Sequence, residues 1–417
     1  MDPENTKVKT IKIRFIPNKE QKLFFNKCFN VYRYYYNQAV GEINNRYSNR
    51  LNEFRNSTTC ILCENNKDED SFLCKKHYKN KLPWKLNISL PSIRNAVLVP
   101  DKENDVEWQK EIPYDVRQLA IQDAVFAYKS AIALKSNGHI DNFTLKYKNK
   151  NLPTKIFSIT HKSLKTGWKL FPTRLKKHSK LQFKNREKKK LPNLSDVKDF
   201  KIMSDHGKMY VLLPVESSAI PHKPANKTVI ALDPGIRVFQ TGYDPSGVIL
   251  NIGDNLKDVI TPLYNRIDKL KSIKSKKRKK YNVNKRIIKI EKQIKNKINN
   301  LHNQTSALIT KEYENIILPE FGTSKMLAGN MLHSSVKRMM NTLSFYRFKQ
   351  KLRYEAYKRK RNLYIVTEEF TSKTCTSCGK IKNNLGSNKV FECTDCGLKI
   401  DRDINGARNI LIKYTII

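Results

Sequence analysis

The sequence is short of acidic residues, lacks long hydrophobic runs and has no internal repeat. Its 417 residues contain 38 Asp and Glu against 81 Lys and Arg, which gives a formal net charge of +43. Self-repulsion of this size destabilises a compact chain unless a polyanion offsets it. With 39% hydrophobic and 10% aromatic residues, the chain can nevertheless build a core. The composition therefore predicts a folded protein whose partner is nucleic acid.

Signals for membrane insertion or secretion are also missing. No hydrophobic run reaches the roughly 18 residues that a membrane-spanning helix needs, and the opening MDPENTKVKT contains no apolar signal segment. We therefore expect a soluble, intracellular protein. Cysteine is sparse, but seven of the eight cysteines fall in two tight clusters. Such clusters favour metal binding over disulfides in this setting, and the remaining Cys28 is expected in the core.

The C-terminal cluster has the spacing of a zinc ribbon. Cys375, Cys378, Cys393 and Cys396 form C-x2-C-x14-C-x2-C, in which each pair can direct two thiolates at one tetrahedral ion. Because all four positions are filled by protein, the spacing predicts a structural zinc ion and not a catalytic one.

The N-terminal cluster is less regular. Cys60, Cys63, Cys74 and His77 form C-x2-C-x10-C-x2-H. This spacing predicts a second structural zinc site in a small exposed finger. Three unliganded thiols and a surface histidine are the alternative.

A proline-containing segment without regular periodicity, 217–227, predicts a domain boundary. Local patterns predict the elements that precede it. Alternating apolar residues predict a strand over 8–16, and PNKEQ predicts a helix with Asn18 as its N-cap and Gln21 completing a capping box. We also expect a helix, a strand and a hairpin turn at 114–135, 143–150 and 205–208, respectively.

After this boundary, apolar strands end beside acidic residues. The strands are expected at 228–233, 248–253, 315–321 and 362–369. Three of them end next to Asp233, Glu320 and the Glu368–Glu369 pair, and Asp401 or Asp403 precedes a helix. Carboxylates gathered at strand ends can bind two divalent ions that act on a phosphodiester. From spacing alone, solvated or salt-bridged acids explain the pattern equally well.

A strongly basic helical region lies between these strands. From 274 to 297, twelve Lys and Arg residues accompany the single Glu291. The cluster KSKKRKK is expected to contact a phosphate backbone, with a solvated helix face or a nuclear import signal as alternatives. The residues expected at this contact are Lys274, Lys276, Lys277, Arg278, Lys279 and Lys280.

Several motifs together resemble a known family. They are ALDPGIR (231–237), LPEFGTSKM (318–326), TSKTCTSCG (371–379) and CGLKIDRDINGARNIL (396–411). With the opening IRFIPNKEQKLFFNKCFNVYRYYYNQAV (13–40), the chain is similar to the TnpB/OrfB transposon-encoded proteins, and most similar to the Fanzor relatives of eukaryotes and their large DNA viruses. The resemblance covers most of the chain.

This resemblance implies an α+β multidomain fold. It implies a β-barrel wedge domain at 1–16 and 140–225, and a helical recognition domain at 17–139 with the zinc finger at 56–81. It also implies an RNase H-like (RuvC) α/β nuclease domain at 226–417, with the zinc ribbon inserted at 371–397.

The resemblance further implies which acids are catalytic and hold two Mg²⁺ ions. Asp233 matches the family's first catalytic aspartate. Asp403 matches the aspartate of the closing D-x-N-[GA]-A motif, with Asp401 as the second choice.

The remaining acid is where the chain departs from the family. Pro319–Glu320 stands where most bacterial relatives have Glu–Asp, and a one-residue shift turns a strand side chain to the opposite face. Some members instead carry a glutamate two residues before the aromatic of [FY]TSKTC, and Glu368 holds that position here. We therefore expect Glu368, and not Glu320, as the second acid, and we expect Glu369 in solvent.

The implied activity is RNA-guided cleavage of DNA for a transposable element. A guide RNA would pair with target double-stranded DNA, and the protein would read only a short adjacent motif. Two Mg²⁺ ions would serve cleavage, and one or two Zn²⁺ ions would be structural. The alternatives are a cleavage-deficient RNA-guided DNA-binding protein and an accessory DNA-binding protein of a transposon. The implied location is the nucleus of a eukaryotic host or a viral replication compartment.

Overall fold

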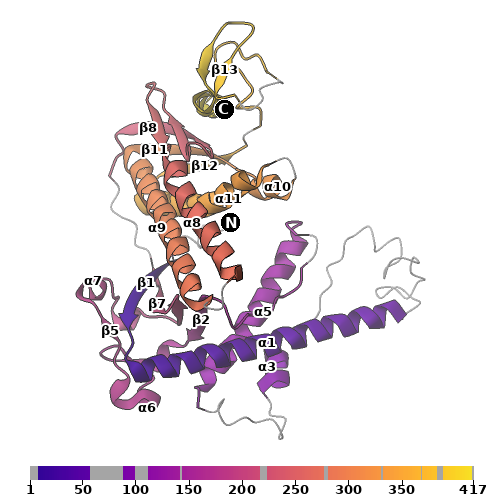
Figure 1. Ribbon diagram of the computed structural model, residues 1–417, viewed down its shortest axis with the longest axis vertical. Helices are drawn as coiled ribbons and strands as arrows, with labels where there is room; N and C mark the ends of the chain where they lie inside the picture. The colour runs from indigo at the N-terminus through magenta and orange to yellow at the C-terminus, as the bar shows by residue number, and fades with distance from the viewer. Residues whose placement is uncertain are drawn as a thin grey trace. The chain divides into compact units, whose positions relative to one another are not determined.

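The chain forms two compact units, Val8–Glu216 and Ser217–Ile417, here called the N-terminal and C-terminal units (Figure 1). The computed structural model describes residues 8–56, 88–98, 111–140, 143–216, 223–276, 280–329, 332–367, 369–382 and 388–415. Both units combine helices with a sheet, so the fold is of the expected α+β multidomain kind. None of the described helices is long and apolar enough to cross a membrane.

The N-terminal unit contains a five-stranded antiparallel sheet with the strand order β2-β6-β7-β1-β5. The strands are β1 (Val8–Ile16), β2 (Thr154–Ile159), β5 (Gln182–Phe183), β6 (Phe200–Asp205) and β7 (Lys208–Glu216), beside the small pair β3 (Leu164–Lys165) and β4 (Lys169–Leu170). The predicted hairpin turn joins β6 to β7 through His206 and Gly207, which both have positive φ, 53° and 77°. This is the backbone that a two-residue hairpin loop requires.

The expected strand at 143–150 is wrong, because its backbone is engaged by a side chain. The Asn37 amide nitrogen donates to the Lys148 carbonyl at 3.1 Å, and the Lys148 N–H donates to Asn37 Oδ1 at 2.7 Å. With both groups taken, Lys148 cannot join a sheet ladder, and residues 143–149 run without regular structure.

The helices of this unit are α1 (Lys19–Asn56), α3 (Leu90–Leu98) and α5 (Tyr114–Ser136), with the short α6 (Pro172–Leu175) and α7 (Asn185–Lys188). The predicted capping box at the start of α1 is confirmed. The Gln21 N–H donates to Asn18 Oδ1 at 2.8 Å, and the Asn18 N–H donates to Gln21 Oε1 at 3.2 Å. Five aromatic residues of α1 are buried in the core: Phe25, Phe29, Tyr32, Tyr35 and Tyr36.

The C-terminal unit contains a mixed sheet with the order β10-β9-β8-β11-β12. Its strands are β8 (Lys227–Pro234), β9 (Gln240–Tyr243), β10 (Ile249–Ile252), β11 (Tyr313–Pro319) and β12 (Asn362–Val366). β8, β11 and β12 run parallel, whereas β9 and β10 pair antiparallel. Since β8, β11 and β12 are parallel, their carboxyl ends lie at one edge of the sheet.

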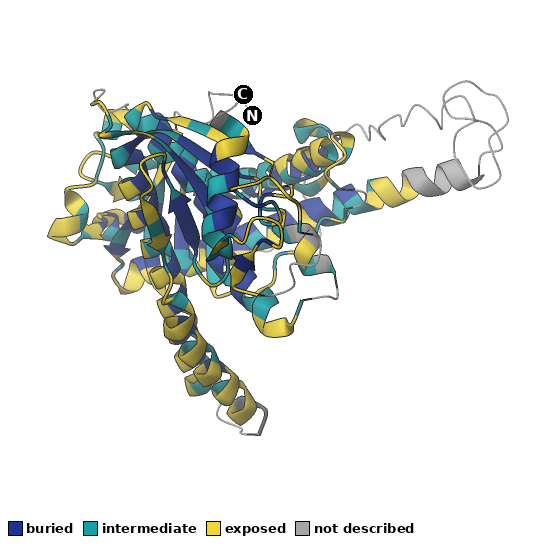
Figure 2. Cartoon of the chain, turned by 90° about the horizontal axis from the view of Figure 1, so that it is seen from above, coloured by how far each residue is buried: buried dark blue, intermediate teal, exposed yellow. Residues whose placement is uncertain are grey.

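Helices cover both faces of this sheet. They are α8 (Leu256–Lys276), α9 (Lys280–Glu312), α10 (Thr323–Ala328), α11 (Ser334–Leu343), α12 (Phe345–Arg359) and α13 (Arg402–Thr415). Ile230, Leu232 and Leu318 pack toward α8, α9, α11 and α12, whereas Ala231 and Ile317 pack toward α13. The strands are accordingly mostly buried, and the long helices keep exposed sides (Figure 2). β13 (Val390–Glu392) and β14 (Lys399–Asp401) form a separate hairpin.

A buried histidine lies within the larger of these cores. His302 of α9 is 1% exposed, stacks on Phe239 with a centroid distance of 5.2 Å, and donates from Nε2 to the Leu343 carbonyl at 2.9 Å. Burial lowers the pKa of His302 to about 4, although this hydrogen bond opposes the shift. The neutral imidazole is therefore the form that fits the core.

We expect this histidine to make the C-terminal unit sensitive to acid. Its folded pKa lies below the unfolded value of about 6.5, so its contribution is complete above pH 6.5 and is lost as the pH falls toward 4. At pH 5 the loss should be about 2 kcal/mol. Hydrogen exchange of α9 peptides at pH 7 and pH 5 measures it. A His302→Gln variant should show a shallower acid slope, and the surface variant His333→Gln is the control; equal slopes in wild type and His302→Gln would contradict the assignment.

Candidate functional site

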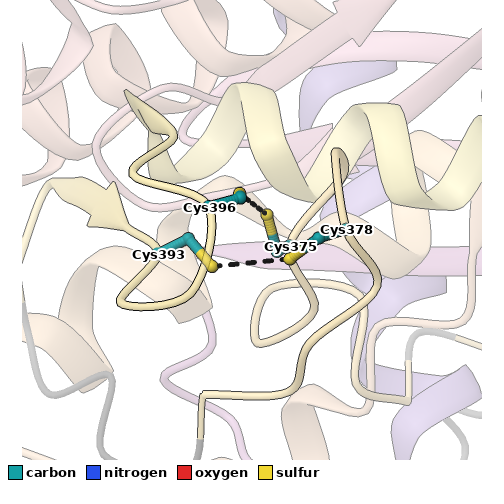
Figure 3. Close-up of side chains that lie close together, drawn as sticks. All are labelled: Cys375, Cys378, Cys393 and Cys396. Carbon is teal, nitrogen blue, oxygen red and sulfur yellow. Dashed lines mark hydrogen bonds between the residues drawn. The ribbon is translucent and has the colours of Figure 1, made fainter.

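The four C-terminal cysteines converge as their spacing predicted. Their Sγ atoms all lie within 4.8 Å of one another. Cys375–Cys396 and Cys378–Cys393 each have an Sγ–Sγ distance of 3.6 Å (Figure 3). A tetrahedral zinc ion with Zn–S bonds of about 2.3 Å needs sulfurs roughly 3.8 Å apart. The cluster can therefore hold one zinc ion with four protein ligands.

Each cysteine pair is shaped by the same backbone turn. The Gly379 N–H donates to the Cys375 carbonyl at 3.0 Å, and the Gly397 N–H donates to the Cys393 carbonyl at 3.2 Å. Both glycines have positive φ, 76° and 73°, where a side chain would be strained. Cys375 and Cys393 are buried around Phe391, which forms the small core of this zinc ribbon.

The thiols do not all favour deprotonation in the absence of a cation. Backbone N–H groups of Cys396 and Asp395 lower the pKa of the Cys393 thiol to about 7. At Cys378 the Lys380 N–H also lowers the pKa, but desolvation and the neighbouring sulfurs outweigh it and raise the pKa to about 12. Four adjacent thiolates therefore need a cation, which zinc supplies in such clusters.

Other expected site residues lie outside the described residues. This holds for Glu368, for the N-terminal cluster of Cys60, Cys63, Cys74 and His77, and for Lys277, Arg278 and Lys279. Lys274, Lys276 and Lys280 belong to the ends of α8 and α9, but their side chains also lie outside the described part. The roles assigned to these residues stay predictions.

Two of the expected acids line one cavity of about 720 Å³ in the C-terminal unit. Asp233 comes from the end of β8, and Asp403 comes from the first turn of α13. Glu369, which we expected in solvent, is exposed and also belongs to the lining. The cavity thus gathers carboxylates at the edge of the sheet where the parallel strands end.

Three basic residues share the lining of this cavity. They are Arg237, Lys373 and Arg402. In such a cavity the carboxylates can bind a metal ion and the basic side chains can bind a phosphate.

Asp233 contacts α13 at a position where only glycine leaves room. A Cβ added to Gly406 would lie 2.4 Å from Asp233 Oδ2. The contact follows from the packing of α13, because its Ile410 and Leu411 bury against the sheet face that carries Ala231. The Asp233 carboxylate therefore rests against the helix that carries Asp403.

Asp401 and Asp403 have different surroundings. Asp401 Oδ1 accepts the N–H groups of Asp403 at 2.9 Å and Ile404 at 3.4 Å, so Asp401 caps α13. Asp403 lines the cavity, and burial together with the nearby Asp401 charge raises the pKa of its carboxyl. Arg402, Arg237 and Lys389 oppose this shift. A cation bound in the cavity would favour the ionised Asp403.

The strand register shows which side of the sheet Pro319 and Glu320 each face. Pro319 pairs with Val366, and Ile317 pairs with Ala231. Ala231, Ile317 and Val366 all pack on the α13 side of the sheet. Pro319 therefore holds the β11 position on the Asp233 face, and alternation turns Glu320 to the other face.

Glu320 is accordingly engaged away from the cavity. Its Oε1 accepts from Lys349 Nζ of α12 at 3.1 Å, and its side chain is 69% exposed. Glu320 is absent from the described cavity lining.

Two asparagines of α13 fasten the ribbon segment to this helix. The Asn405 amide nitrogen donates to the Thr374 carbonyl at 2.8 Å, and its Oδ1 accepts the Thr376 N–H at 3.3 Å. The Asn409 amide nitrogen donates to the carbonyls of Thr371 at 2.8 Å and Thr374 at 2.6 Å. Both asparagines are buried, and the Asn409–Thr371 bond forms away from water.

Reasoning from the sequence missed this asparagine clamp and the basic lining of the cavity. The spacing of Asn405 and Asn409, four residues apart, places both on one face of a helix and could have indicated the clamp. No comparable signal singles out Arg237, Lys373 and Arg402 in a chain with 81 Lys and Arg residues.

Comparisons with known proteins match both ends of the chain and its whole length. Residues 345–410 match the Cas12f1-like TNB domain, and residues 7–51 match the OrfB helix-turn-helix domain. In this chain the second match comprises β1 followed by the single long helix α1. "TnpB-like protein L79" of Acanthamoeba polyphaga mimivirus is 28% identical over 96% of this chain and 72% of its own.

Two further relatives have different names. "Putative transposase A625R" of Paramecium bursaria Chlorella virus 1 is 26% identical over 98% of this chain and 87% of its own. "Putative RNA-guided DNA endonuclease InsQ" of Escherichia coli (strain K12) is 23% identical over 52% of this chain and 56% of its own. The matches define a class of transposon-encoded OrfB-type proteins. The predicted resemblance to the TnpB/Fanzor family is thereby confirmed.

The ribbon should contribute one zinc ion to the metal content of the purified protein. Replacing Cys393 by Ser removes one of the four ligands, so the Cys393→Ser variant should hold about one zinc ion less per chain than wild type. Elemental analysis of the full-length protein measures this difference. Replacing the core Cys28 by Ser is the matched control and should leave the zinc content unchanged. An unchanged content in Cys393→Ser would exclude zinc from the ribbon.

Loss of the Asn409 amide should loosen the ribbon segment. The Asn409→Ala variant leaves the buried Thr371 carbonyl without this donor, while the Thr374 carbonyl keeps Asn405, and the loss should cost about 2 kcal/mol. Hydrogen exchange of peptides spanning 369–382 should increase, whereas Asn300→Ala, at an exposed position on α9, should leave it unchanged. Wild-type exchange in Asn409→Ala would show that the clamp adds no local stability.

Proposed function

We propose that the protein is an RNA-guided DNA endonuclease of a transposable element. The observation that carries this proposal is the cavity in which Asp233 and Asp403, from segments far apart in the sequence, lie together with three basic residues. A phosphodiester is the substrate that such a mixture of carboxylates and cations suits. The names of relatives, among them a putative RNA-guided DNA endonuclease, support the same activity.

The topology of the C-terminal unit supports an RNase H-like (RuvC) nuclease domain. Numbered in chain order, its strands have the order 3-2-1-4-5, with the first three antiparallel and the last two parallel to the first. The first strand ends in Asp233, and α13 packs on the adjacent face. We propose that this unit is the nuclease domain, with the cysteine cluster as its inserted zinc ribbon.

The chemistry of the cavity fits hard divalent cations. Carboxylate oxygens are the ligands that Mg²⁺ prefers, and Asp233 and Asp403 would hold the ions. The raised pKa of Asp403 fits this role, because burial and Asp401 disfavour its charge until a cation offsets it. Bound Mg²⁺ would activate water and offset the charge that develops at the phosphodiester.

The residues of the chain have separate tasks in this proposal. Arg237, Lys373 and Arg402 would bind phosphate oxygens and hold the strand in the cavity. Asp401 keeps α13 capped, so the first turn with Asp403 stays formed. Gly406 lets the helix approach the Asp233 carboxylate directly.

We propose Glu368 as the second catalytic acid, between Asp233 and Asp403 in chain order. The ion pair of Glu320 with Lys349 supports the exclusion of Glu320. In the sequence, Glu368 follows two residues after Val366, which packs on the α13 side of the sheet, and directly precedes Glu369, which lines the cavity. The family pattern favours Glu368 over Glu369.

A guide RNA and target double-stranded DNA are the proposed partners. The net charge of +43 suits a protein that binds both, and the basic region around KSKKRKK supports phosphate contacts. The division of the chain after Glu216 supports a separate nuclease domain. We propose that the preceding unit contains the β-barrel wedge and helical recognition domains, and that the protein acts in the nucleus or in a viral replication compartment.

Single substitutions should distinguish the acids that are needed for cleavage from those that are not. Full-length protein co-purified with RNA from the flanks of its gene is incubated with a matched DNA library and Mg²⁺. The Asp233→Ala, Asp403→Ala and Glu368→Ala variants should each lose at least about 100-fold in cleavage rate, because each removes a metal ligand. Glu320→Ala and Glu369→Ala should stay within about threefold of wild type.

Each failure of this experiment has a distinct meaning. Wild-type protein that binds matched DNA but never cuts it would support the cleavage-deficient alternative. Absence of a discrete co-purifying RNA would leave the accessory DNA-binding protein. If Glu369→Ala is inactive and Glu368→Ala is active, the second catalytic acid is Glu369 and not Glu368.

A further inference from the structure

One aromatic side chain in the cavity lining has no evident part in the fold. Phe370 lines the cavity, and its side chain is 61% exposed. Its backbone has φ of 62°, a region that is unfavourable for bulky residues and natural for glycine. Phe321 also lines the cavity, but its ring packs against Phe345 with a centroid distance of 4.7 Å. A turn alone would favour glycine at position 370, so the exposed ring calls for another explanation.

The segment around Phe370 is held firmly. The Phe370 carbonyl accepts the Lys373 N–H at 2.9 Å, the Thr374 N–H at 3.0 Å and the Thr374 hydroxyl at 2.9 Å. The next residue, Thr371, is 4% exposed, and Asn409 binds its carbonyl. These contacts keep the unfavourable backbone conformation and present the ring in the cavity lining.

The neighbours of the ring indicate what it binds. Arg237, Lys373 and Arg402 line the same cavity and attract phosphate groups. An exposed aromatic ring among cations is the arrangement that binds single-stranded nucleic acid, because phosphates contact the cations and a base stacks on the ring. A base inside a duplex is already stacked between its neighbours and is not available to such a ring.

We propose that Phe370 is a stacking platform for a base of single-stranded DNA beside the Asp233–Asp403 site. The proposal rests on the proposed function in one respect, namely that the bound strand is the one to be cut. Stacking would place that strand with its phosphate next to the carboxylates. It would also exclude duplex DNA, so that the site acts only on a strand that has been separated.

The test uses single-stranded DNA oligonucleotides that contain the fluorescent base 2-aminopurine. Full-length protein with its co-purified RNA is titrated in Ca²⁺, and quenching of the base reports stacking. The Phe370→Ala variant should weaken binding by about 5- to 100-fold and abolish quenching, whereas Phe370→Trp should retain both. Tyr346→Ala is the matched control, because Tyr346 is also 61% exposed but lies on α12 outside the described cavity lining.

A second variant separates stacking from folding. Phe370→Gly places glycine where φ is 62°, so its Tm should equal or exceed that of wild type while DNA binding falls as in Phe370→Ala. Wild-type binding and quenching in Phe370→Ala would overturn the proposal, even if the protein cuts DNA. If Phe370→Ala weakens the binding of an RNA oligonucleotide but not of DNA, the proposal would also be overturned. If Phe370→Ala weakens DNA binding but the wild-type protein never cuts DNA, the stacking proposal would stand. The proposed nuclease activity would then be refuted.

Discussion

The hydrogen bonds from Asn405 and Asn409 to the Thr371–Thr376 segment hold the candidate site together. Helix α13 packs on the sheet, contacts the Asp233 carboxylate through Gly406 and contributes Asp403. The asparagine amides then fasten the ribbon segment to the same helix. One wall of the cavity therefore depends on four hydrogen bonds that involve neither a proposed catalytic acid nor a proposed zinc ligand.

The zinc ribbon and the cavity are linked by this clamp. The segment that the asparagines bind runs directly into Cys375 and Cys378, whose turns a zinc ion would stabilise. A structural zinc ion in the ribbon would in this way stiffen the cavity wall. The same segment contains Lys373 and directly follows Phe370, so the clamp orders a cation and the turn that carries an aromatic ring.

Charge balance explains why the acids of this site are unusual in the chain. Most carboxylates that the structure describes with a partner are paired with a lysine or arginine on the surface, as Glu320 is with Lys349. Asp403 is different, because burial and Asp401 raise its pKa. A cation favours its charged form, and a divalent ion bound in the cavity can supply that charge.

Much of this arrangement could be predicted from the sequence. The cysteine spacing determined the ribbon, because a tetrahedral ion requires four thiolates at such intervals. The Asn18–Gln21 capping box and the DHGK turn were also predictable, since they are local. The motifs around Asp233 and Asp403 indicated the two acids, and strand alternation indicated that Glu320 would turn away.

Only the tertiary structure decided how these parts meet. The sequence pattern predicted a strand around Lys148, but the backbone of Lys148 is hydrogen-bonded to Asn37, which is distant in the sequence. The approach of Gly406 to Asp233, the clamp from Asn405 and Asn409, and the exposed ring of Phe370 in the cavity likewise join segments far apart in the chain. Sequence patterns report contacts between neighbouring residues. Contacts across such separations are set by how whole helices and strands pack.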